Sequence, residues 1–137
     1  MDSKKEVLTI DVKINEFLTV KGTTGEATMI LFTGHCNSEL FHGEILPGGV
    51  DTQKQWYGKQ RELSARYILD GIDFDGKTCK LFIENNGFFH ENGNLITQPK
   101  IFTDSKALAF LENATLTGTI EGIEGGVRIH IFDDNVM

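Results

Sequence analysis

Three polar residues in the middle of the chain have the side-chain types that acid–base chemistry uses. Asp51 can act as a general base or as a hydrogen-bond anchor for a hydroxyl or ammonium group. Tyr67 can donate a proton or stabilise an enolate-like oxygen, and Asn85 can orient a substrate. The sequence therefore predicts Asp51 and Tyr67 as catalytic candidates, with Asn85 as a ligand-binding residue beside them.

Each of these residues also has a purely structural interpretation, which the sequence leaves open. Asp51 can cap the preceding turn or pair with Arg66, because Asp readily bonds to nearby groups. Tyr67 can be a core ring whose hydroxyl has a partner, since buried phenols normally find one. Asn85 can be an Asx-type turn residue before Gly87.

The segment Pro47-Gly48-Gly49 precedes Asp51 and is predicted to end a strand. Pro lacks a backbone N–H, and two Gly residues favour a turn that exposes backbone N–H groups to a ligand. Gly48 and Gly49 are therefore candidate ligand-binding residues, and Asp51 is expected at the rim of the fold. Arg66 alternates with Tyr67 and is expected on the opposite face, where the favoured role is structural, pairing with a carboxylate of the same chain or of a neighbouring subunit, and ligand binding is the alternative.

Other kinds of site lack their sequence signatures. His35, Cys36, His42 and Glu44 match no standard metal-ligand spacing, so no metal is expected. No GxSxG, Walker or GxGxxG motif is present, so the sequence predicts no recognised hydrolase triad, no nucleotide site and no cofactor. Cys36 and Cys79 belong to no CxxC pair and are expected to be reduced, buried thiols; His90 and His130 are expected to be structural.

The balance of charged residues limits the classes of binding partner that we expect. Twenty acidic and 13 basic residues give a net charge of −7, and no stripe of Lys and Arg is available to bind phosphates, so nucleic acid is not expected. No apolar run approaches the roughly 20 residues of a membrane helix, and the N-terminal residues lack the pattern of a signal peptide. We therefore expect a cytoplasmic protein with no membrane partner.

Alternating apolar and polar residues predict a chain made mostly of strands. Strands are expected at residues 7–14, 27–33, 40–46, 61–70, 78–85, 114–123 and 127–132. Residues 51–60 are expected to be a loop or an irregular edge, and residues 101–113 a short helix or another strand. Hairpin turns are predicted at residues 73–76 and 124–126, with further turns at 85–87 and 91–94.

Short strands, Gly-rich turns and no βαβ alternation favour an all-β fold. We expect one domain over residues 1–137, an antiparallel β-barrel of about seven or eight strands with at most one short helix. A barrel is favoured over a sandwich because closure removes exposed strand edges.

The run from Gly43 to Gly87 resembles the domain-of-unknown-function family numbered 3237. Its pattern corresponds here to Gly43, Pro47-Gly48-Gly49, Asp51, Ala65-Arg66-Tyr67, Gly76 and Asn85-Asn86-Gly87. Thr52 stands where that family often has Trp, so Trp56 becomes a candidate ligand-binding residue in its place. The resemblance implies a small β-barrel, similar to allene oxide cyclase-like barrels, and a homo-oligomer, but supplies no reaction.

Three functions are compatible with these residues. The leading hypothesis is a small-molecule-binding barrel for an apolar or aromatic metabolite, because the chain has ten Phe and few polar residues at inward positions. The first alternative is an isomerase or cyclase with Asp51 and Tyr67 as its acid–base pair. The second is a non-catalytic, oligomeric assembly protein with Arg66 at its interface.

Overall fold

The computed structural model describes residues 4–89 and 95–134. His90 and the turn predicted at residues 91–94 lie outside them. The described chain contains nine strands and one 3-10 helix: β1 (Lys5–Lys21), β2 (Gly25–Asn37), β3 (Phe41–Ile45), β4 (Val50–Trp56), β5 (Glu62–Asp73), β6 (Thr78–Phe89), β7 (Leu95–Thr103), η1 (Ala109–Glu112), β8 (Leu116–Ile123) and β9 (Gly126–Asp133).

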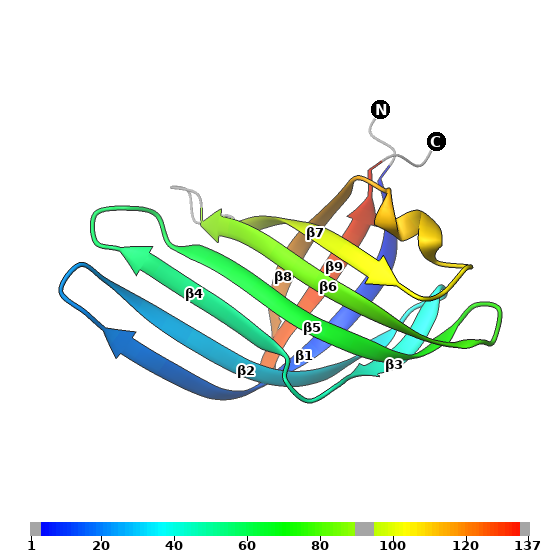
Figure 1. Cartoon of the computed structure of the whole chain (residues 1–137), viewed down its shortest axis with the longest axis horizontal. Coiled ribbons are helices and arrows are strands. Elements are labelled where there is room, and N and C mark those ends of the chain that lie inside the picture. The colour runs from blue at the N-terminus through cyan, green and yellow to red at the C-terminus, as the bar shows by residue number, and fades with distance from the viewer. Residues whose placement is uncertain (1–3, 90–94, 135–137) are drawn as a thin grey trace.

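The strands form one antiparallel sheet that closes on itself. Neighbours follow the order β1, β9, β8, β7, β6 and β5; β3 and β4 then lie between β5 and β2, and β2 pairs with β1. In Figure 1, β5, β6 and β7 form the near wall, and β8 and β9 cross behind it. The prediction of an antiparallel barrel is confirmed, with nine strands where seven or eight were expected.

The segment Pro47-Gly48-Gly49 is a bulge inside the wall. Both β3 and β4 run antiparallel to β2 and to β5, so together they act as one interrupted strand. Ile45 faces Leu69 and Val50 faces Arg66, which leaves four residues of this strand opposite two residues of β5. Gly48 has φ +110°, a backbone conformation that suits glycine. The predicted break is therefore real, but the chain continues in the same direction beyond it.

Two local predictions are wrong, and a third is correct in part. Residues 51–56 belong to β4 rather than to a loop, because both of their edges pair, with β2 and with β5. Asn85, Asn86 and Gly87 lie inside β6 rather than in a turn, since each pairs with β5 and with β7, and pairing outweighs the turn preference of Asn and Gly. The short helix or strand expected at residues 101–113 is present in part, since residues 101–103 end β7 and residues 109–112 form a 3-10 helix.

The two ends of the barrel interior differ. One end is filled by buried side chains, among them Phe41, Leu69, Leu81 and Ile131, and Leu108 and Leu111 of the η1 segment pack against this core. The Ser105 hydroxyl donates to the Asp73 carboxylate at 2.7 Å and ties that segment to the end of β5. The other end is hollow. No helix in the part of the chain that the structure describes is long and apolar enough to cross a membrane.

Candidate functional site

A cavity of about 280 Å³ occupies the hollow half of the barrel. Its lining comes from β1, β2, β4, β5, β6, β7, β8 and β9, and is mostly apolar: Val12, Ile14, Ile30, Phe32, Leu63, Ala65, Phe89, Leu95, Ile120, Val127 and Ile129. Three polar side chains, Asp51, Gln53 and Asn85, complete it. An apolar cavity with a few polar groups on one wall is typical of a small-molecule site.

Asp51 and Asn85 lie on either side of Ala65 in one cross-strand row. Asp51 of β4 faces Ala65 of β5, and Ala65 faces Asn85 of β6. Because side chains alternate across a strand, residues paired in this way point to the same side of the sheet. The methyl group of Ala65 leaves open space between the carboxyl and the amide, so one molecule in the cavity can reach both.

The two carboxyl oxygens of Asp51 have different surroundings. Oδ2 accepts a hydrogen bond from Gln53 Nε2 at 2.9 Å, and Gln53 Oε1 in turn accepts one from Arg61 Nε at 2.8 Å. Oδ1 is buried and has no hydrogen-bond partner among the described residues. Burial raises the pKa of Asp51, an effect that hydrogen bonding to Gln53 and to the Ser64 backbone and the charge of Arg61 only partly offset. The relay from Arg61 thus orients the carboxyl and leaves one oxygen for a ligand.

Asn85 also presents an unsatisfied oxygen. Its side chain is 1% exposed, and its Oδ1 has no partner within residues 4–89 and 95–134. Thr97 Oγ1 of β7 is likewise buried without a partner there. A side chain at Gly118 of β8 would lie 3.6 Å from Asn85 Nδ2 and closer still to Thr97 Oγ1, so the glycine keeps room beside these groups.

Tyr67 lies apart from this cavity. It shares the inner face of β5 with Ala65, but it is 3% exposed and does not belong to the lining. Its ring packs edge-on against Phe32, with 5.5 Å between the ring centroids. Phe32 lines the cavity, whereas Tyr67 does not. Burial raises the pKa of the Tyr67 hydroxyl, which has no partner in the described chain. The structure therefore does not bring the predicted acid–base pair together.

The remaining candidates point elsewhere. A side chain at Gly48 would meet nothing within 4 Å, and Gly49 backs onto Phe32. Trp56 lies near the end of β4, half-exposed, with the Lys54 ammonium 5.2 Å from its ring centroid. Arg66 is on the outer face, as expected, where its Nε lies 3.7 Å from Glu84 Oε2. None of these four lines the cavity.

Sequence reasoning missed Gln53 and Arg61, which hold the Asp51 carboxyl. Both lie at or next to the stretch read as a loop, so no inward position was assigned to them. The alternation Asp51, Gln53 along one face of β4 is the signal that would have found Gln53.

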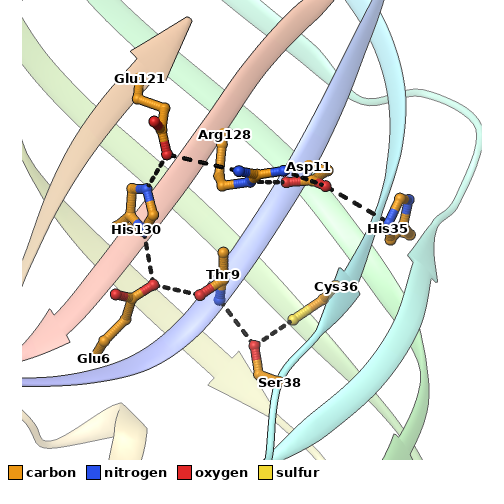
Figure 2. A network of polar contacts seen from close by, with 9 residues as sticks. All are labelled: Glu6, Thr9, Asp11, His35, Cys36, Ser38, Glu121, Arg128 and His130. Carbon is orange, nitrogen blue, oxygen red and sulfur yellow. Dashed lines mark hydrogen bonds and ion pairs between the residues drawn. The ribbon is translucent and has the colours of Figure 1, made fainter. Parts of the chain in front are cut away.

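Polar groups on the outer face, in contrast, satisfy one another (Figure 2). His130 of β9 lies between Glu6 of β1 and Glu121 of β8, with 2.7 Å from each ring nitrogen to a carboxylate oxygen. Hydrogen bonds to Glu6 and Glu121 raise the pKa of His130. Both ring nitrogens of His130 therefore have partners, as expected of a structural histidine.

A second ion pair extends this network. The Arg128 guanidinium donates to both Asp11 oxygens, at 2.6 and 3.2 Å, and this hydrogen bonding lowers the pKa of Asp11. Ser38 links the backbone N–H of Thr9 to the Cys36 thiol. Cys36 and Cys79 are buried and free, as expected, and no cluster of three potential metal ligands occurs among the described residues.

Comparisons with known proteins place the chain in a family. The family model described as "Protein of unknown function (DUF3237)" matches residues 3–96. A UPF0311 protein from Clostridium acetobutylicum is 33% identical over 86 residues, which cover 61% of this chain and 52% of that protein. The chain thus spans about half the length of this curated relative.

Solved structures share the fold. A protein of unknown function from Clostridium acetobutylicum superposes with a TM-score of 0.81 at 22% identity, over 97% of this chain and 99% of that one. A β-barrel-like protein from Acinetobacter baumannii gives a TM-score of 0.72 at 16% identity, over 96% and 94% of the two chains. Because the family model covers well over half of the sequence, this chain belongs to the DUF3237 family of proteins of unknown function.

Proposed function

We propose that this protein binds a small, mostly apolar or aromatic molecule in the barrel cavity, with a hydrogen-bond donor directed at Asp51 and Asn85. One observation carries the proposal: two buried oxygens, Asp51 Oδ1 and Asn85 Oδ1, lack partners in the described chain and belong to the polar residues of an otherwise apolar cavity.

The energetics favour a ligand that donates hydrogen bonds. A buried polar atom without a partner costs about 1–3 kcal/mol, so a bound N–H or O–H group recovers stabilisation that the empty barrel lacks. The apolar side chains around these oxygens would gain from covering a ring. Ala65 provides the space between the two oxygens, and Gln53 fixes the orientation of one of them.

A matched pair of probes tests the role of the donor. Indole has one N–H group, and 1-methylindole has the same ring system without it. Isothermal titration is expected to show saturable binding of indole that is about tenfold tighter than that of 1-methylindole, since one hydrogen bond is worth about 1 kcal/mol or somewhat more. Equal affinities, or no binding of either probe, would contradict the proposal.

Two variants test the location. Ala65→Leu fills the space between Asp51 and Asn85 and is expected to abolish indole binding. Ser64→Leu makes the same kind of change on the opposite face of β5 and should leave binding unchanged. Thermal melts of both variants establish that they fold. Should Ala65→Leu unfold, Asp51→Asn provides the second measurement and is expected to weaken indole binding about tenfold.

Proton transfer by Asp51 is the second candidate function. Its raised pKa and its position on the cavity wall suit a general base, whereas Tyr67 lies outside the lining and is not available as the acid. Native mass spectrometry and chromatography of co-purified molecules distinguish the two functions. One molecule held by both the natural chain and Asp51→Asn indicates binding; a precursor held by the variant and its product held by the natural chain indicates catalysis.

A further inference from the structure

The outer face of β5, β6 and β7 carries a row of apolar side chains, of which the two outer ones are exposed and the central one is half-buried. Ile68 pairs with Phe82, and Phe82 pairs with Phe102, so the three lie side by side across the wall. Phe102 is 69% exposed and Ile68 38%. The rings of Phe82 and Phe102 stack with 6.2 Å between their centroids. Contiguous aromatic surface of this kind marks an interaction site more often than isolated apolar residues do.

Two charged rows flank this apolar row, one on each side. Two residues before Ile68 along β5, the first row contains Arg66, Glu84 and Lys100, paired in register. Two residues after Ile68, the second row contains Asp70 and Lys80, and the Asp104 carboxylate continues it by accepting from the Lys80 backbone N–H at 2.8 Å. The charges are therefore plus, minus, plus in the first row and minus, plus, minus in the second.

We propose that this face binds the same face of a second copy of the chain, related by a two-fold axis that runs along the Ile68–Phe82–Phe102 row. Rotation about that axis exchanges the two charged rows and keeps each strand opposite its own copy. Arg66 then meets Asp70 of the second copy, Glu84 meets Lys80, and Lys100 meets Asp104. Every charge faces its opposite, around an apolar centre, as in known interfaces.

The other face-to-face arrangement is excluded by the same charges. A two-fold axis along the strands would place Arg66 over Lys100, Asp70 over Asp104, and Glu84 and Lys80 each over their own copies. All of these pairs repel. Of these two face-to-face arrangements, the charges therefore favour only the one whose two-fold axis runs along the apolar row.

The net charge of the chain also favours this face. The chain carries −7 overall, so most of its surface repels a second copy. The two rows contain three basic and three acidic residues, which makes this face neutral. Arg66–Glu84 at 3.7 Å and Lys80–Asp70 at 3.6 Å are exposed ion pairs, each of little value to the folded chain alone. Assembly would give them additional partners of opposite charge.

Multi-angle light scattering and native mass spectrometry test the proposal. At about 100 μM, above the micromolar Kd values of weak interfaces, the natural chain is expected at about 31 kDa, twice its 15.3 kDa. Arg66→Glu and Asp70→Arg are each expected to be monomeric, because each sets like charges opposite one another at both symmetry-related positions. Phe102→Ser should also be monomeric, and Lys13→Glu, on the exposed face of β1, should stay dimeric.

A mixture of the two charge variants provides the decisive measurement. When Arg66→Glu and Asp70→Arg are combined, each altered residue meets an opposite charge, so heterodimers are expected although neither variant dimerises alone. Mixing leaves the folding free energy of each variant chain unchanged, so a heterodimer that forms only in the mixture reports on the contact between the chains. A monomeric natural chain, a stoichiometry other than two, or a mixture that stays monomeric would overturn the proposal. Indole binding by the monomeric variants, measured separately, shows whether the cavity is intact.

Discussion

Asp51 is half-buried on the wall of an apolar cavity, with its Oδ1 atom fully buried, and its ionised form is held there at a cost to the folded state. Because burial raises its pKa in the folded chain, the unfolded chain loses the proton first as pH rises. The folded state therefore loses stability between the ordinary pKa of Asp and the raised one. The natural residue is maintained in a position that favours a neutral side chain.

Replacing this carboxyl should separate stability from binding. The stability of Asp51→Asn relative to the natural chain is expected to increase as pH rises from about 3 to about 7, since only the natural chain loses the contribution of this proton. Urea titrations at several pH values measure the difference in unfolding free energy. A difference that stays constant over this range would show that Asp51 titrates alike in both states.

The sequence indicates Asn85 as a polar residue at an inward position of its strand, and Asp51 by its place after the Pro47-Gly48-Gly49 turn. Tyr67 shares the inward parity and is a candidate on the same ground as Asn85. The alternation of residues along a strand indicates whether a side chain faces the inside or the outside of a barrel. It does not indicate whether an inward side chain lies in the filled half or in the hollow half. The separation of Tyr67 from the cavity depends on the packing of Phe32, which no local pattern reveals.

At the scale of the strands, His130 joins the hairpin of β8 and β9 to β1, which is distant in sequence. Its two ring nitrogens contact Glu6 on β1 and Glu121 on β8, from its own position on β9. The raised pKa means that the folded chain holds this proton more tightly than the unfolded chain does. The stabilisation is complete below the ordinary pKa of His and is lost as pH rises through the raised value.

His130→Gln should therefore destabilise the protein more at pH 6 than at pH 9. The difference is expected to be about 0.5–1 kcal/mol, since the group is close to solvent and its ion pairs are screened. Urea unfolding at the two pH values gives the free energies. His42→Gln, which removes an exposed histidine outside this network, is the control, and an equal loss at both pH values for His130→Gln would refute the explanation.

The sequence does not predict β4 or residues 95–100 of β7, and β4 differs from the predicted strands in a physical way. The later half of β5, β6, β8 and β9 bury one face in the core, so their sequences alternate and their turns carry Asp-Gly or Gly-Gly signals. β4 carries polar residues on both faces, because its inward side supplies Asp51 and Gln53 to the cavity. The alternation of apolar and polar residues disappears where the strand contributes polar side chains to the cavity, so the sequence predicts a loop or an irregular edge there.

For the molecule as a whole, one sheet presents different chemistry on its two sides. Along β5, Ala65 faces the cavity while Arg66 and Ile68 face outward, toward the proposed second copy. The two proposals, binding and assembly, thus involve alternate residues of the same strand. Substitutions that disrupt one can leave the other intact, which is why the two proposals can be tested independently.

The bulge in the barrel wall is also a position at which the chain should tolerate an inserted peptide. Pro47 and Gly48 already carry extra length outside the register, and a side chain at Gly48 would meet nothing within 4 Å. A short Gly-Ser peptide or an epitope tag inserted between them should leave the melting temperature nearly unchanged, because lengthening an existing loop costs little chain entropy. The same peptide inserted between Ile68 and Leu69 should unfold the chain, since it would shift every pair beyond it. A fluorescent reporter placed at the bulge would lie on the barrel wall, outside the lining of the cavity.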